Sequence, residues 1–154
     1  MARHILGVLG IAAVAVIALM AFAYRPALAP IAPPAAASFP PELVATGATL
    51  AGAGNCISCH TAPGGRANAG GKVIHTRVGR FYSPNLTPDP ETGIGAWSVA
   101  DLVNAFQTGF TPEFDSFGGS MAAVQRNLAH LSEEDLRAIA EYLKTLPPVK
   151  SARK

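Results

Sequence analysis

The chain has 154 residues, of which 14% are charged and 49% are hydrophobic, and its formal net charge at pH 7 is +2. This length is typical of one domain with accessory segments. Residues 1–29 contain two basic residues and no acidic one, so the rest of the chain carries ten basic and ten acidic residues. A balanced charge and few aromatic residues give no electrostatic reason to expect nucleic-acid binding.

An uncharged and almost wholly apolar segment covers residues 5–24. As a helix rising about 1.5 Å per residue it would reach about 30 Å, the thickness of a bilayer's hydrocarbon core. Two Ala-x-Ala patterns, at 21–23 and 27–29, are typical of signal-peptide cleavage sites. Residues 1–25 are therefore predicted to be either a transmembrane signal-anchor or a cleavable signal peptide. In both cases the rest of the chain is exported, and the N-terminus stays in the cytoplasm.

Residues 26–41 form a second unit with its own composition. Six prolines and six alanines occupy these sixteen positions. Such a segment has neither a regular helix nor a core of its own, and proline-rich linkers stay extended at about 3.1 Å per residue. The segment is predicted to be a spacer that holds a domain up to about 50 Å from its anchor.

One domain is predicted for residues 42–149, followed by a basic tail at 150–154. Its first helix is expected at about 42–53, with Gly47 and Leu50 along one side. This helix leads directly into the sequence CISCH.

Long stretches rich in glycine and proline follow CISCH, first TAPGGRANAGG and then FYSPNLTPDPETGIG. No long alternating strand pattern accompanies them, so the expected fold class is all-α, with short helices and long loops. A small domain built in this way buries too little surface for a stable core of its own. A large apolar cofactor wrapped by the loops would supply the missing core.

Two further helices have clear start and stop signals. Ser98 and Ser132 are the expected N-caps, and acidic residues in each first turn favour the positive end of the helix dipole. Gly109 suits the left-handed position that ends the first of these helices. Pro147 and Pro148 end the second.

Both cysteines of the chain lie in CISCH, residues 56–60. A disulfide between Cys56 and Cys59 would close a very small loop and would restrict the unfolded chain little. A thioredoxin-type redox centre would be expected near a βαβ pattern, which the sequence does not show. A structural zinc site needs four ligands, and His60 follows Cys59 too closely for zinc-finger spacing.

The fourth interpretation is a covalently attached c-type haem, for which C-x-x-C-H is the signature. Each thiol would form a thioether with one vinyl group of the porphyrin, and the adjacent histidine would reach the iron. The absence of other cysteines and the export segment both agree with this chemistry. One haem c is therefore predicted, with Cys56 and Cys59 as attachment residues and His60 as the proximal iron ligand.

The second axial ligand is predicted to be Met121, the only methionine of the domain. Gly118 and Gly119 precede it and would allow close approach to a haem. A His/Met ligand pair raises the reduction potential and suits electron transfer. His75 is the alternative ligand, in a loop expected to cover one haem edge, whereas His130 is expected to be a solvated loop residue.

With these features the chain resembles monohaem class I c-type cytochromes. It is most similar to the cytochrome c domains of cytochrome subunits from bacterial membrane-bound alcohol, gluconate and aldehyde dehydrogenases. Three stretches carry the resemblance: GATLAGAGNCISCHTAPGG at 47–65, FYSPNLTPDPETGIGAWS at 81–98 and LSEEDLRAIAEYLKTLPPV at 131–149. Together they span most of the predicted domain.

The resemblance implies the class I cytochrome c fold, in which the first and last helices of the domain cross beside the haem. Leu50 would then lie near Tyr142 and Leu143. Residues implied on the haem wall or the propionate side are Tyr82, Asn85, Thr87 and Trp97. The chain departs from many relatives in two ways: Met121 reads as the start of a helix capped by Ser120, and the chain carries one haem domain where dehydrogenase subunits often carry several.

The function expected from the sequence is one-electron transport with no substrate of its own. Expected donors are a dehydrogenase or a quinol-oxidising complex, and expected acceptors are a terminal oxidase or another cytochrome. The haem domain would face the periplasm from the bacterial cytoplasmic membrane, or would be soluble in the periplasm if the N-terminal segment is cleaved. Two alternatives stay open: a peroxidase-like haem enzyme with a free sixth position, and a haem sensor in which His75 exchanges with Met121.

Overall fold

The computed structural model describes residues 2–23, 39–77 and 79–151, although the side chains at 2–6, 8, 9 and 23 fall outside the description. The predicted apolar segment forms helix α1 (Ala2–Ala23). No helix within the described ranges combines the length and the apolar character needed to cross a membrane. The choice between anchor and signal peptide stays a prediction. The predicted spacer lies outside the described residues except for positions 39–41.

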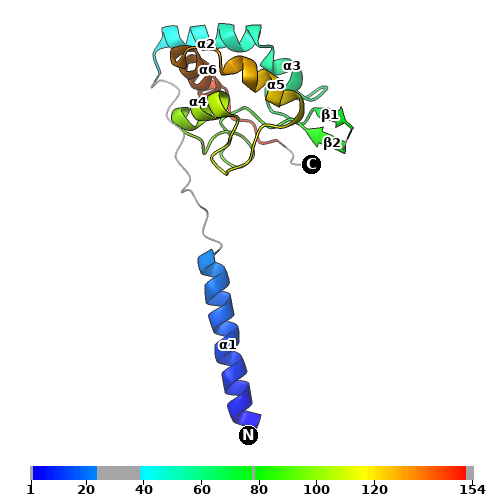
Figure 1. Cartoon of the computed structure of the whole chain (residues 1–154), viewed down its shortest axis with the longest axis vertical. Coiled ribbons are helices and arrows are strands. Elements are labelled where there is room, and N and C mark those ends of the chain that lie inside the picture. Colours follow the sequence, from blue (N-terminus) through cyan, green and yellow to red (C-terminus); the bar gives the residue numbers. More distant parts are fainter. Residues whose placement is uncertain (1, 24–38, 78, 152–154) are drawn as a thin grey trace.

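The remaining described residues form a mostly helical domain (Figure 1). Its elements in chain order are α2 (Pro41–Ala53), α3 (Cys56–Cys59), β1 (Val73–Thr76), β2 (Gly79–Tyr82), α4 (Val99–Thr108), α5 (Gly119–Leu128) and α6 (Glu133–Thr145). Three of these helices, α2, α4 and α6, confirm the helices that the sequence predicts.

The predicted helix caps are formed by local hydrogen bonds. Ser98 caps α4 with a reciprocal capping box, in which its side chain and that of Asp101 each bind the other's backbone N–H. Gly109 ends α4 in the left-handed conformation, with φ of 80°. Ser132 caps α6 by accepting a hydrogen bond from the backbone N–H of Asp135. These contacts confirm the predicted caps. Each lies within one turn of the helix end, so the neighbouring residues alone were enough to predict it.

Helix α5 begins earlier than the sequence predicts. Its N-cap is Gly118, whose backbone is extended at φ −109° and ψ 174°. An N-cap needs this non-helical conformation, whereas Ser120 already lies inside the helix and makes no cap. The prediction of Ser120 as the cap is wrong.

A two-stranded antiparallel sheet corrects the expectation of an all-α fold. Val73 pairs with Tyr82 and Ile74 pairs with Phe81 across β1 and β2. Each strand has only four residues, which is too short for an alternating pattern to stand out in the sequence. The β-branched and aromatic side chains of these strands are nevertheless those that favour extended structure.

Helices α2 and α6 cross in close contact (Figure 1). A Cβ atom added to Gly47 would collide with the backbone carbonyl of Ala138 and would lie 2.9 Å from the Cβ of Tyr142. Leu50 and Tyr142 both pack against the core cluster that contains Leu143. The crossing implied by the family resemblance is confirmed, and Gly47 is the residue that permits it.

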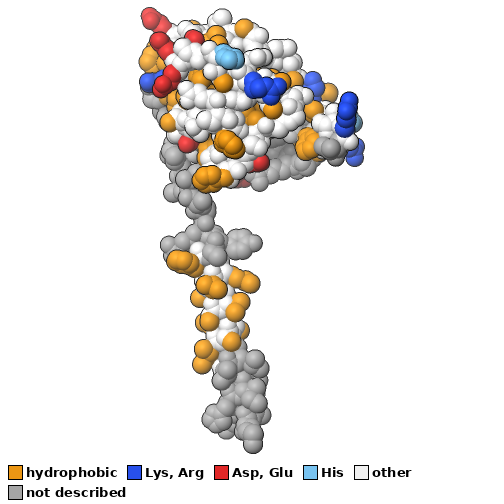
Figure 2. Space-filling view, viewed as in Figure 1, with side chains coloured by type: hydrophobic (Ala, Val, Ile, Leu, Met, Phe, Trp, Pro, Cys, Tyr) orange, Lys and Arg blue, Asp and Glu red, His pale blue; other side chains and the backbone are white. Residues whose placement is uncertain are grey.

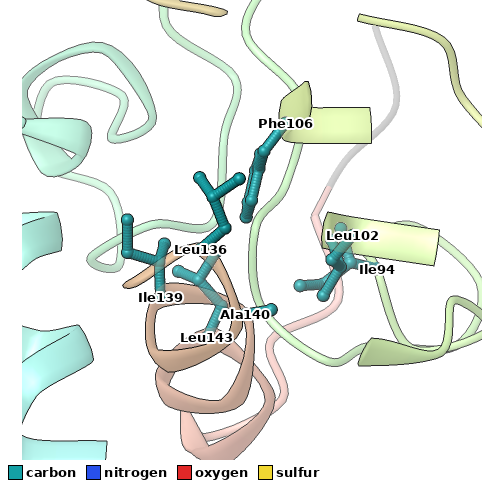
Figure 3. Packing of buried hydrophobic residues seen from close by; sticks show 7 residues of the cluster. All are labelled: Ile94, Leu102, Phe106, Leu136, Ile139, Ala140 and Leu143. Atoms are coloured by element: carbon teal, nitrogen blue, oxygen red, sulfur yellow. The ribbon is translucent and has the colours of Figure 1, made fainter. Parts of the chain in front are cut away.

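The hydrophobic core lies mainly between α4 and α6 (Figure 3). It is formed by two side chains from α4, four from α6 and one from the loop before α4: Leu102 and Phe106, Leu136, Ile139, Ala140 and Leu143, and Ile94. The four residues of α6 recur at three- and four-residue spacing, which is the apolar stripe predicted from the sequence.

Candidate functional site

The two cysteines lie one turn apart at the ends of α3. Asn55 precedes them in the left-handed conformation, with φ of 53°. Both thiols are free, with Cys56 partly buried and Cys59 exposed. Burial raises the pKa of the Cys56 thiol. A reactive redox cysteine needs a lowered pKa, so this environment does not favour the thioredoxin-type interpretation.

His60 caps the C-terminal end of α3 and is buried, with 6% of its surface exposed. Its Nδ1 atom lies 2.9 Å from the carbonyl oxygen of Pro84, 24 residues away in the chain. A carbonyl oxygen only accepts hydrogen bonds, so Nδ1 must carry the proton, and in the neutral ring Nε2 then keeps its lone pair. Burial lowers the pKa of His60 despite this hydrogen bond and favours the neutral ring that binds a metal.

The base of the β1–β2 hairpin is joined to α3 and His60 by backbone contacts. The N–H of Gly70 donates to the carbonyl of His60 at 2.8 Å, and the N–H of Gly71 donates to the carbonyl of Ser83 at the same distance. Gly70 has φ of 73°, and a Cβ there would lie 2.6 Å from the Ser83 oxygen. The Nζ atom of Lys72 donates to the carbonyl of Ser58 at 2.6 Å. Two of these hydrogen bonds, from Gly70 to His60 and from Lys72 to Ser58, link the base of the hairpin to the cysteine helix and its cap.

Met121 lies in the first turn of α5 and is partly buried. Its helix is held to α4 by the side chain of Gln125, which donates to the carbonyls of Phe106 at 3.2 Å and Gln107 at 2.9 Å. The role of Met121 as a ligand stays a prediction. Of the other histidines, His75 lies exposed in β1 instead of in a loop, and His130 is exposed before α6, as expected.

Asn85 and Thr87 are buried and bind the C-terminal segment through hydrogen bonds. The side-chain amide of Asn85 donates to the carbonyl of Val149 at 2.7 Å, and the hydroxyl of Thr87 accepts from the Val149 N–H at 3.1 Å. The Asn85 carbonyl oxygen also accepts from the backbone and the hydroxyl of Thr87. The family resemblance implied both residues beside the haem and did not predict this role in holding the end of the domain.

Lys144 is a buried residue of the domain whose importance the sequence did not reveal. Its side chain is 3% exposed, and Nζ donates to the carbonyls of Ile94, Gly95 and Trp97 at 3.1, 3.0 and 2.6 Å. Burial lowers its pKa. The ring nitrogen of Trp97 in turn donates to Glu113 at 2.9 Å. Lys144 thus fastens the loop before α4 to α6.

Replacement of Lys144 by methionine is expected to lower the free energy of unfolding by about 1–3 kcal/mol, because three backbone acceptors lose their donor. Denaturant unfolding of the haem-loaded protein measures the change. Lys150→Met is the matched control, since Lys150 is exposed and pairs only at the surface with Glu91. If both variants unfold at the same denaturant concentration, the role of Lys144 is contradicted.

The donor set at α3 fits a covalently attached haem. Within the residues that the structure describes, no group of three or more His, Cys, Asp or Glu side chains is arranged to hold a metal ion. The site instead offers two free thiols one turn apart and a neutral imidazole oriented by Pro84. Two thiols suit two thioether bonds, and an oriented Nε2 suits one axial position on iron.

Comparison with known proteins agrees with this chemistry. Residues 44–147 match the family model described as Cytochrome c. A nicotinate dehydrogenase subunit of Pseudomonas putida is 38% identical over 130 residues, which cover 84% of this chain and 11% of that protein. The gluconate 2-dehydrogenase cytochrome c subunit of Pantoea cypripedii is 38% identical over 113 residues, 73% of this chain and 25% of that protein.

A third relative is the cytochrome c subunit of the quinone-type alcohol dehydrogenase from Gluconobacter oxydans. It is 36% identical over 108 residues, which cover 70% of this chain and 22% of that protein. The chain therefore spans a quarter or less of the length of each of these three relatives. The matched family covers nearly all of the domain from α2 to α6, and its C-x-x-C pair implies covalent haem c. The chain belongs to the cytochrome c family.

Proposed function

We propose that the domain carries one electron at a time on a single c-type haem, with His60 and Met121 as axial ligands. The observation that carries this proposal is the position of His60, which directly follows a pair of free thiols. His60 is buried, and its Nδ1–H donates to the carbonyl of Pro84. When bound, the haem supplies an iron that alternates between Fe(III) and Fe(II).

Each residue of the site has a separate part in this function. Cys56 and Cys59 hold the cofactor by thioether bonds, which keeps it in place in both oxidation states. Pro84 orients the His60 ring and fixes its tautomer, since the carbonyl binds the Nδ1 proton. Met121 supplies a thioether donor, which favours the reduced state and raises the reduction potential.

The partners that we propose are a dehydrogenase or a quinol-oxidising complex as donor and a terminal oxidase or another cytochrome as acceptor. Support comes from the relatives, whose names describe dehydrogenase subunits. We further propose that residues 1–25 export the domain to the periplasmic side, as an anchor or as a cleaved signal. A tether of residues 26–41 would raise the effective concentration of weakly docking partners.

Intact-mass and absorbance measurements test this proposal. The chain is produced in a host with c-type haem maturation and purified from membranes under mild detergent. The expected product has the mass of one added haem and a reversible change in its spectrum on reduction. Cys56→Ala/Cys59→Ala is expected to lose all covalently bound haem. Haem retained through denaturation in that double variant would contradict the attachment site, and the same mass data show whether the N-terminal segment is cleaved.

A further inference from the structure

The chain after α6 folds back onto the loop that contains Pro84. We name its residues 146–151 the C-terminal strap. The N–H of Val149 in this strap donates to the hydroxyl of Thr87 at 3.1 Å. The carbonyl of Val149 accepts from the side-chain amide of Asn85 at 2.7 Å. Strap and loop are thus joined by hydrogen bonds across 62 and 64 residues of sequence.

Asn85 uses its whole side-chain amide in this arrangement. The residue is buried, with 4% of its surface exposed. Its side-chain nitrogen donates to the carbonyl of Val149 and, at 3.1 Å, to the hydroxyl of Thr92. Its side-chain oxygen accepts from the N–H and the hydroxyl of Thr87, at 2.9 and 2.8 Å. A side-chain amide has two donor and two acceptor positions, so all four are occupied and the conformation of Asn85 is fixed.

Pro84 lies between two residues that are held in place. Asn85 follows it directly, and Ser83 precedes it. The N–H and the carbonyl of Ser83 are both bound to the backbone of residues 71–72, at 2.9 and 2.8 Å. The proline ring also fixes its own φ. The Pro84 carbonyl therefore has little freedom to turn away from the Nδ1 atom of His60, which lies 2.9 Å from it.

We infer that the C-terminal strap positions the Pro84 carbonyl on His60 and thereby sets the reduction potential of the haem. The inference rests on the proposed electron-carrier function and names the residues that tune it. A hydrogen bond from Nδ1–H makes the imidazole a stronger donor through Nε2, and a stronger donor favours Fe(III). Loss of the strap's hydrogen bonds lets the carbonyl move, weakens this bond and raises the potential. Asn85, Thr87 and Val149 are positioning residues, since they act on the iron through Pro84 and His60.

Two substitutions remove the same hydrogen bond from its two sides. Thr87→Val removes the hydroxyl that accepts from the strap, and Val149→Pro removes the N–H that donates to it. Each is expected to shift the Fe(III)/Fe(II) equilibrium of the haem-loaded protein about 2–10-fold toward Fe(II). A tenfold change in a one-electron equilibrium corresponds to about 59 mV, so the potential rises by about 20–60 mV. Spectroelectrochemical titration measures the shift.

The double variant Thr87→Val/Val149→Pro separates action through the strap from direct action on the haem. If both residues act through one hydrogen bond, the double variant shifts the potential no further than the larger single change. Proton NMR of the reduced protein reads the His60 contact in each variant by itself. A weaker bond to Pro84 moves the Nδ1–H signal to lower frequency and speeds its exchange with water. Thr87→Ser keeps the hydroxyl and is expected to keep the original potential and signal.

Ser132→Ala is the structural control. It removes the N-cap of α6, whose hydrogen bonds are with Asp135 in the first turn of the helix. It is expected to lower the midpoint of denaturant unfolding and to leave the potential unchanged. All of these substitutions keep the net charge, because an altered charge would change the potential through its own field. Figure 2 shows that the visible charges are unevenly spread, with most Lys and Arg side chains toward the β1–β2 end and most Asp and Glu side chains at the opposite end.

Two outcomes would overturn the inference. One is a Val149→Pro variant with an unchanged potential and an unchanged Nδ1–H signal, which would assign any effect of Thr87→Val to direct contact with the haem. The other is a rise in potential in Ser132→Ala as large as in the strap variants, which would reduce the effect to a general loosening of the domain. A chain without covalent haem contradicts the proposed function itself, whereas a haem protein whose potential does not depend on the strap contradicts only the positioning role.

Discussion

Replacement of Gly47 by alanine is expected to destabilise the domain by about 3 kcal/mol, because overpacking a close contact costs about 1–3 kcal/mol and occasionally more. The added Cβ would collide with the backbone carbonyl of Ala138 in α6 and would approach the Cβ of Tyr142. Backbone atoms cannot turn aside as a flexible side chain can, so α2 and α6 must move apart. This movement would loosen the core that Leu50 and Tyr142 pack against.

The same substitution at Gly52 is the control, because Gly52 also lies in α2 but has open space around the position of a Cβ. Gly52→Ala is expected to stabilise the helix by about 0.5–1 kcal/mol, since alanine restricts the unfolded chain and favours the helix. Guanidinium unfolding of both haem-loaded variants, followed by far-UV circular dichroism, gives the two values. Similar stabilities for the two variants would show that the crossing tolerates a side chain.

Replacement of Met121 by histidine is expected to lower the reduction potential by a few tenths of a volt, within the range of about 0.8 V that axial ligands span. An imidazole is a stronger donor than a thioether and favours Fe(III). Spectroelectrochemical titration measures the potential. Val124→Ala changes an exposed side chain one turn further along α5 and is expected to leave the potential unchanged.

Ligand binding separates this assignment from a peroxidase-like site. With Met121 on the iron, the reduced protein is expected to bind CO slowly, and Met121→Ala is expected to bind it rapidly. Rapid CO binding by the unmodified protein, or an unchanged potential in Met121→His, would show that Met121 is not the ligand. An exchange with His75 is tested by His75→Ala, which should leave the spectra unchanged.

The caps of α4 and α6 could be predicted from local sequence signals, whereas the cap of α5 and the hairpin could not. The caps at Ser98 and Ser132 were predicted because each hydrogen bond spans three residues. The hairpin was missed because its short strands are stabilised by pairing and by the contacts of Lys72 and Gly70 with the cysteine helix. Ser120 was a wrong cap because two preceding glycines let the helix start earlier.

The sequence by itself determined the cofactor chemistry and the main helices, because the spacing of CISCH and the apolar stripes are properties of neighbouring residues. Only the tertiary structure decided which nitrogen of His60 is free, since Pro84 must fold back across 24 residues to bind the other one. The close approach at Gly47 and the buried position of Lys144 likewise exist only in the folded chain. Each of these contacts joins residues that are far apart in the sequence.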